Sequence, residues 1–291
     1  MYNFFIMGTT LEYTNKNALK YYCFDWDDNI LVMPTMIHLE RRIGKKWEKM
    51  DITTSEFAEV RTQLNDYYNK GNKKSEWRFY NNERSDAFCE FRDQGTRGKR
   101  AFLQDAKKSI KYEKFGPVWD EFIKCLVGGH RFLIITARGH EPETLKGTVK
   151  WMIYKILTES QRNQLVRNLK CWTATFSIKT DGWDDDEHIN YYLNLCDFIG
   201  IYSDWFAKNF ESYGDVGSPE KYKAMAVKHF VKKISKFGKV LNRQVKVGFS
   251  DDDLATVESI HKYFKDELSL DFPIEYYSWH TKDDGTKIKM N

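Results

Sequence analysis

Cysteine is scarce in this chain, and its spacing follows no pattern. The five cysteines include no Cys-x-x-Cys pair, which argues against a disulfide framework and against a zinc site. No apolar run approaches the length of a membrane-spanning segment, and the first residues lack the basic stretch that opens a secretory signal. We therefore expect reduced thiols, a cytoplasmic location and no membrane partner.

An excess of charge of one sign is also absent. A net charge of +4 over 291 residues is compatible with anionic substrates but too small to predict extensive nucleic-acid binding. The chain contains no internal repeat and no low-complexity tract. With 41% apolar and 30% charged residues, it has the composition of a folded globular protein rather than a disordered one.

Short apolar runs alternate with helical patterns over much of the sequence. The apolar runs predict strands at 21–25, 131–136, 198–203, 245–249 and 274–279. The helical patterns predict helices at 143–157, 219–237 and 254–268. This alternation predicts an α/β fold with a Rossmann-like, mainly parallel sheet that carries helices on both faces.

The predicted strands are unevenly spaced, which indicates two insertions. Residues 31–130 follow the first core strand and predict a mostly helical cap module. Residues 1–30 and 131–291 then form the core domain, which carries its own insertion at about 141–195.

Three segments within these insertions have recognisable patterns. Gly44 marks a hairpin in the cap, and residues 55–68 predict a helix. The basic, glycine-containing segment 92–100 is either a contact for a substrate anion or a solvated loop. The acidic run 181–187 predicts a surface loop rather than a second metal site.

Two aspartates, Asp25 and Asp27, follow the first predicted strand. The carboxyl end of a strand is where open α/β sheets bind ligands, and alternate residues of an extended segment face the same side. Such a pair can hold a hard divalent cation while one carboxylate acts as a nucleophile or as an acid and base. The alternative is a helix N-cap or an acidic turn.

The second core strand ends at Thr136, with Ala137 and Arg138 directly after it. A hydroxyl, backbone amides and a guanidinium at a strand end are donors that suit phosphate oxygens. In the alternative interpretation, Thr136 caps the next helix and Arg138 is solvated.

A third group of charged residues comes late in the chain. Asp251, Asp252 and Asp253 follow the fourth core strand, where their mutual repulsion would be relieved by a bound cation or by the start of the next helix. Lys221 and Lys223 lie near the start of the preceding helix. Either could neutralise a nucleophile or phosphate, or simply be solvated.

Four motifs in this order resemble those of the haloacid dehalogenase-like (HAD) phosphohydrolase superfamily. They comprise three strand ends and one helix position, namely Asp25-x-Asp27, Thr136, Lys223 and Asp251-Asp252. The resemblance covers roughly residues 20–30, 131–140 and 197–279, and the long segment after the first motif resembles the family's cap site.

The resemblance implies a magnesium-dependent phosphatase that forms an aspartyl-phosphate. The implied roles are nucleophile for Asp25, acid and base for Asp27, phosphate binding for Thr136, Ala137, Arg138 and Lys223, and magnesium binding for Asp25, Asp27, Asp251 and Asp252. Lys221 and Asp253 are the alternatives for the lysine and for one metal ligand. Asp28 and Asn29 depart from the family's usual glycine and from its threonine or valine.

The expected substrate is a small phosphorylated metabolite or a nucleotide, and a phosphorylated nucleic-acid end would use the same chemistry. Two other classes stay open. One is a non-catalytic HAD-fold binding protein. The other is a carboxylate-cluster nuclease, which gives no clear role to Thr136 or to the lysine.

Overall fold

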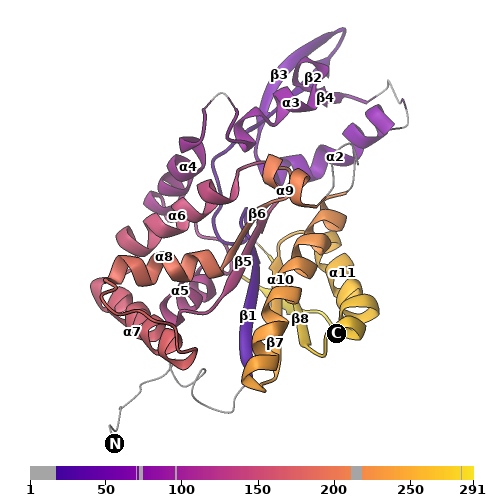
Figure 1. Ribbon diagram of the computed structural model, residues 1–291. Helices are drawn as coiled ribbons and strands as arrows, with labels where there is room; N and C mark the ends of the chain where they lie inside the picture. The colour runs from indigo at the N-terminus through magenta and orange to yellow at the C-terminus, as the bar shows by residue number, and fades with distance from the viewer. Residues whose placement is uncertain (1–17, 70, 72–74, 96, 211–217, 283) are drawn as a thin grey trace, which may run out of the picture.

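The computed structural model describes residues 18–69, 71, 75–95, 97–210, 218–282 and 284–291. Its centre is a six-stranded sheet in the order β6-β5-β1-β7-β8-β9 (Figure 1). The strands are β1 (Leu19–Asp25), β5 (Phe132–Thr136), β6 (Asp197–Gly200), β7 (Val245–Asp251), β8 (Glu275–Thr281) and β9 (Lys287–Lys289). All neighbouring strands are parallel except β8 and β9. The predicted α/β fold with a mainly parallel sheet is confirmed.

The five predicted core strands are present, with shifts at their ends. β6 ends at Gly200 because the Ser203 hydroxyl accepts a hydrogen bond from the backbone N–H of Phe206 and so caps α9 (Asp204–Asn209). β7 and β8 instead run two residues beyond their predicted ends, to Asp251 and Thr281. These extensions place additional polar side chains at the carboxyl edge of the sheet.

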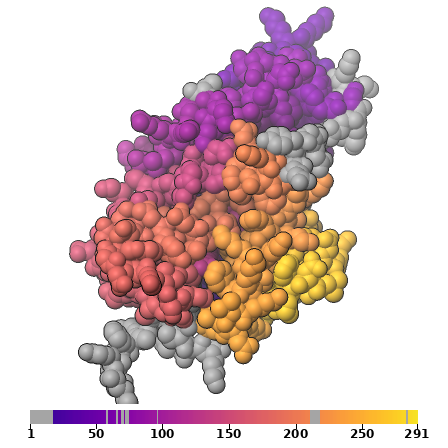
Figure 2. All heavy atoms as spheres, in the orientation of Figure 1, coloured from indigo at the N-terminus to yellow at the C-terminus, as the bar shows by residue number. Residues whose placement is uncertain are grey.

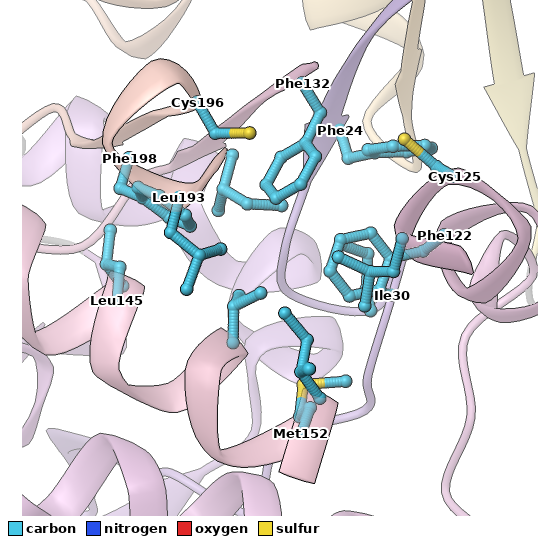
Figure 3. Packing of buried hydrophobic residues seen from close by; sticks show 14 of the residues in the cluster. Phe24, Ile30, Phe122, Cys125, Phe132, Leu145, Met152, Leu193, Cys196 and Phe198 are labelled. Carbon is cyan, nitrogen blue, oxygen red and sulfur yellow. The ribbon is translucent and has the colours of Figure 1, made fainter. Parts of the chain in front are cut away.

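Alternate residues of the central strands point into two apolar cores, one on each face of the sheet. On β5, Phe132 and Ile134 belong to the first core, while Leu133 and Ile135 belong to the second. The first core, part of which is drawn in Figure 3, is covered by α4 (Arg100–Lys111), α5 (Trp119–Gly128), α6 (Pro142–Lys155), α7 (Glu159–Thr175) and α8 (Asp185–Leu195). The second is covered by α9, α10 (Pro219–Leu241), α11 (Leu254–Tyr263) and a π-helical turn (Phe264–Leu268), after which the short α12 (Ser269–Asp271) buries no residue.

The acidic run at 181–187 is not a surface loop along its whole length. Asp184 accepts a hydrogen bond from the backbone N–H of Glu187, whose side chain in turn accepts from the backbone N–H of Asp184. This capping box starts α8, and Asp185 and Asp186 lie in its first turn. Acidic residues are favourable there because the amino end of a helix carries partial positive charge.

Residues 37–91 form a separate lobe that we call the cap. The cap contains a three-stranded antiparallel sheet, β3-β2-β4, and an apolar cluster of its own. Its elements are β2 (Ile37–Ile43), β3 (Lys46–Ile52), α2 (Thr54–Asn69), β4 (Trp77–Phe79), α3 (Arg84–Ala87) and two 3₁₀ turns (Tyr80–Asn82 and Cys89–Phe91). In the space-filling view of Figure 2, the cap protrudes at one end of the molecule.

The predicted hairpin at Gly44 and the predicted long helix are both present in the cap, where a third strand, β4, also pairs with the hairpin. β2 pairs with β3 on one side and with β4 on the other, and its alternating residues Ile37 and Leu39 are buried in the apolar cluster of the cap. The helices α4 and α5, which we assigned to the cap, instead pack on the main sheet through Phe102 and Phe122.

None of the helices in the described part of the chain is both long and apolar enough to span a membrane.

Candidate functional site

A cavity of about 370 Å³ opens at the carboxyl ends of β1, β5 and β7. Its wall includes Asp25, Asp27, Lys223 and Asp251 from the main domain. Thr54, Phe57, Arg61 and Phe88 of the cap complete the wall on the other side. The strand ends that the sequence singled out are thus brought to one place, as the topology of a parallel sheet requires.

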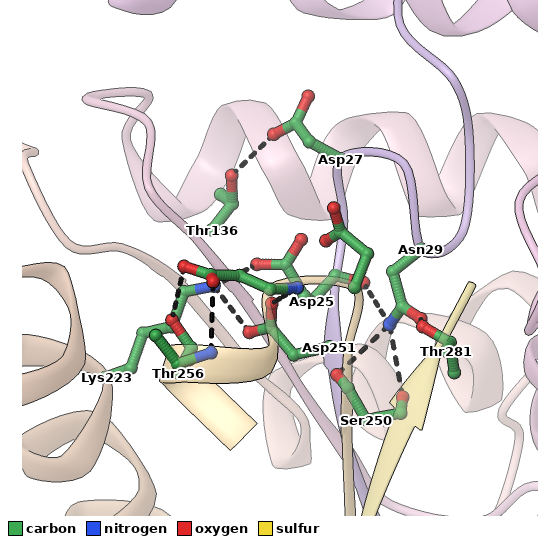
Figure 4. A network of polar contacts seen from close by, with 12 residues as sticks. Asp25, Asp27, Asn29, Thr136, Lys223, Ser250, Asp251, Thr256 and Thr281 are labelled. Atoms are coloured by element: carbon green, nitrogen blue, oxygen red, sulfur yellow. Dashed lines mark hydrogen bonds and ion pairs between the residues drawn. The ribbon is translucent and has the colours of Figure 1, made fainter. Parts of the chain in front are cut away.

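Lys223 lies between two of the predicted carboxylates. Its Nζ donates hydrogen bonds to Oδ1 of Asp25 and to Oδ2 of Asp251, each at 2.6 Å (Figure 4). Ser218 caps α10 and Pro219 opens it, so that the side chain of Lys223 is buried one turn into the helix. Lys221, the alternative lysine, is exposed. The structure therefore places Lys223 rather than Lys221 at the site.

Asp25, Asp251 and Asp252 form a cluster in which one oxygen atom of each lies within 4.8 Å of the others. Burial raises the pKa of Asp25 well above its usual value, although Lys223 acts in the opposite direction. Burial and the nearby Asp251 raise the pKa of Asp252 to about 8. Burial also raises the pKa of Asp251 against the effect of Lys223.

One ammonium therefore faces three clustered carboxylates. Carboxylate oxygens are the ligands that hard cations such as magnesium prefer, and a divalent cation would relieve the remaining repulsion. The donor set of this cluster fits magnesium, with Asp25, Asp251 and Asp252 as the residues that would hold it.

Asp27 lies outside that cluster. Arg138 donates from Nε and Nη2 to the Asp27 carboxylate, the shortest contact being 2.6 Å, and the Thr136 hydroxyl donates to Oδ2 at 2.9 Å. Burial alone would raise the pKa of Asp27, but Arg138 outweighs burial and lowers it. Asp27 is thus held in its ionised form beside the cluster rather than in it.

Arg138 is almost fully buried, and it is bound to the protein rather than facing the cavity. Its Nη2 also donates to the Thr35 hydroxyl at 3.0 Å, and its guanidinium lies over the ring of Phe91, with 4.3 Å to the centroid. Thr136 is buried as well. The cavity wall next to them is formed by Ala137, so the two side chains predicted to hold phosphate instead hold Asp27.

Asp28 and Asn29 have clear structural roles. Asp28 has a φ of 55°, a left-handed conformation that glycine adopts freely and that aspartate tolerates better than most residues. Asn29 is buried, and its amide nitrogen donates to the backbone carbonyls of Asp25 and Ser250. Its Oδ1 accepts from the Thr281 hydroxyl, so that Asn29 connects β1, β7 and β8.

Asp253, the alternative metal ligand, is used elsewhere. Its carboxylate accepts from the backbone N–H of Ala255 and so caps α11, and it also pairs with Arg61 of the cap at 3.2 Å. A second cap residue, Thr54, donates to Asp28 Oδ2 at 2.6 Å. Sequence reasoning missed both cap contacts, because they depend on how the cap sits on the sheet.

Comparison with known proteins adds no relative to this picture: no protein-family model, curated protein or solved structure matches the chain.

Proposed function

We propose that this protein is a magnesium-dependent phosphatase of HAD type that hydrolyses phosphomonoesters through an aspartyl-phosphate on Asp25. The observation that carries the proposal is the placement of Lys223 between Asp25 and Asp251, with Asp252 completing a cluster of carboxylates at neighbouring strand ends. Phosphoryl transfer depends mainly on positioning and charge neutralisation, which are what this set of residues supplies.

In the first step, a carboxylate oxygen of Asp25 attacks phosphorus while the bond to the leaving oxygen breaks. Lys223 fixes Oδ1 of Asp25, which leaves Oδ2 as the attacking oxygen. Asp25, Asp251 and Asp252 would hold the magnesium ion, whose positive charge would stabilise the charge on the transferring group. In the second step, water attacks the acyl phosphate, inorganic phosphate leaves and the Asp25 carboxylate is restored.

Asp27 is suited to the second step more than to the first. Its lowered pKa keeps the carboxylate ionised at neutral pH, which is the form that accepts a proton from the attacking water. To protonate a leaving group, Asp27 must first gain a proton, although Arg138 stabilises its ionised form. The enzyme should therefore work best on esters whose leaving groups need little protonation, such as aryl phosphates.

The test is hydrolysis of 4-nitrophenyl phosphate with and without magnesium. We expect turnover that requires magnesium and falls to background in Asp25→Asn. The panel should also contain mononucleotides and oligonucleotides phosphorylated at their 3′ or 5′ ends. Retained activity in Asp25→Asn would exclude Asp25 as the nucleophile, and a wild type that hydrolyses nothing in the panel would exclude the phosphatase.

A further inference from the structure

A second cavity, of about 240 Å³, lies next to the catalytic one. Arg84 and Arg92 of the cap region line one side of it, and Tyr202 of the main domain lines the other. The two cavities adjoin, because Phe88, Phe91 and Ala137 line both. We call this second space the arginine cavity.

The charges of the two cavities are opposite. The catalytic cavity is lined by six aspartates and only two cationic side chains, Arg61 and Lys223. The arginine cavity is lined by two arginines and no acidic residue. Neither Arg84 nor Arg92 forms an ion pair with a carboxylate within the described ranges, whereas many other arginines of the chain do.

Arg84 is held by aromatic rings instead. Its guanidinium lies 5.3 Å from the ring centroid of Tyr202 and 5.6 Å from that of Phe88. Arg92 donates from Nη2 to the backbone carbonyl of Ser85 at 3.4 Å. Ring stacking orients a guanidinium without neutralising its charge, so its N–H donors stay suited to an anion.

The floor of the arginine cavity is fixed by backbone contacts. The N–H of Gly139 donates to the carbonyl of Phe91 at 2.8 Å, and the N–H of Tyr202 donates to that of Arg138 at 3.1 Å. A Cβ atom at Gly139 would come within 2.9 Å of the Tyr202 carbonyl oxygen and 3.3 Å of the Arg92 Cβ. The close approach of these three segments thus depends on glycine, and it holds Arg92 against the strand end that carries Ala137.

We propose that the arginine cavity binds a second anionic group of the substrate. The substrate class would then be phosphomonoesters whose leaving group carries a further phosphate or carboxylate. The guanidinium fork matches both anions in geometry and charge. This inference rests on the proposed function, since it assumes that the phosphoryl group is bound at Asp25.

The first test compares substrates that differ only in the second anion. The phosphate pair is adenosine 3′,5′-bisphosphate against adenosine 5′-phosphate, and the carboxylate pair is 3-phosphoglycerate against glycerol 3-phosphate. We expect kcat/KM to be about tenfold higher for the bis-anionic member of at least one pair. The pair that shows the preference identifies the second anion, and a wild type that hydrolyses both members of each pair with equal kcat/KM overturns the proposal.

The second test removes the arginines. In Arg84→Gln/Arg92→Gln the preference should disappear while turnover of 4-nitrophenyl phosphate stays within about twofold. Arg100→Gln, an exposed arginine outside both cavities, is the matched control and should keep the preference. A double variant that keeps the preference overturns the proposal even if the phosphatase itself is established.

A binding measurement distinguishes the proposal for the arginine cavity from the proposal that the protein is a phosphatase. Isothermal titration of Asp25→Asn with adenosine 3′,5′-bisphosphate, or with 3-phosphoglycerate if the carboxylate pair shows the preference, measures affinity without turnover. We expect that affinity to fall about tenfold when Arg84→Gln and Arg92→Gln are added. An unchanged affinity would contradict the arginine cavity, whereas the absence of turnover in the wild type would contradict only the phosphatase.

Discussion

Two buried sets of charged groups stand side by side at the carboxyl edge of the sheet, and they differ in balance. In the cluster of Asp25, Asp251 and Asp252, one lysine faces three carboxylates, and the pKa values of the carboxyl groups are raised. In the pair of Asp27 and Arg138, one guanidinium faces one carboxylate, and the pKa of Asp27 is lowered.

This difference distinguishes a group of side chains with excess negative charge from a pair whose charges balance. An excess of buried negative charge is unfavourable unless a cation neutralises it. A charge-balanced pair joined by two hydrogen bonds needs no further counter-ion and fixes a side chain in place. We therefore propose that the cluster binds the metal and the phosphoryl group, and that Arg138 positions Asp27.

The largest effect is expected from removing the one cation in the cluster. Lys223→Gln should lower kcat/KM for 4-nitrophenyl phosphate about 10²- to 10³-fold, because Asp25 loses the group that orients it and balances its charge. Lys221→Gln, an exposed lysine two residues earlier in the same helix, is the control and should leave the rate unchanged. Equal losses in both variants would contradict the assignment.

Breaking the balanced pair should have a smaller effect on a different kinetic constant. Arg138→Met leaves Asp27 without its bidentate partner, and kcat should fall about 100-fold while KM changes little, since Arg138 does not line the cavity. Steady-state kinetics on 4-nitrophenyl phosphate separates the two constants. A large rise in KM with unchanged kcat would instead make Arg138 a substrate-binding residue.

Adjacent acids allow the metal assignment to be tested directly. Asp252→Asn should raise the magnesium concentration needed for half-maximal activity about tenfold, because one of three clustered ligands is lost. In Asp253→Asn this concentration should stay the same, because Asp253 caps α11 and pairs with Arg61. Magnesium titrations of both variants test this, and the reverse ranking would move the ligand to Asp253.

The strand ends could be predicted from the sequence because the carboxyl ends of parallel strands necessarily meet. Asp25 and Asp251 converge as expected for that reason, and Lys223 contacts both of them from α10. The partner of Arg138 could not be predicted, because a guanidinium suits phosphate and carboxylate equally and nothing near it in the sequence distinguishes them.

The cap was the least predictable part of the chain. In β2 only Ile37 and Leu39 form a clear alternating apolar pair, so the sequence predicts the hairpin at Gly44 but not the pairing of β2 with β4. The contacts of Arg61 and Thr54 with the strand ends depend on packing between residues far apart in the sequence. Local patterns carry no information about such contacts.

The smallest expected effect is on stability. It concerns a third buried pair of titratable side chains, His140 and Asp93, which are joined by a hydrogen bond. Burial lowers the pKa of His140 below its usual value of 6.5, so the unfolded chain takes up a proton more readily than the folded protein. The free energy of unfolding should therefore fall as the pH drops below about 6.5. Urea denaturation at several pH values measures this dependence, and His140→Gln should weaken it. An unchanged pH dependence of the free energy of unfolding in this variant would contradict the role of His140.

The bridge made by Asn29 has a consequence for the order in which the chain becomes functional. Asn29 and Asp25 are synthesised early, but Ser250 and Thr281, to which Asn29 is bonded, emerge from the ribosome more than 200 residues later. The strand β7, which pairs directly with β1 and carries Asp251, also comes late. A nascent chain that has completed the cap and α4 to α9 thus still lacks Lys223 and Asp251, which contact each other beside Asp25. The carboxylate cluster and the bonds of Asn29 therefore assemble only after β7 and β8 have been made.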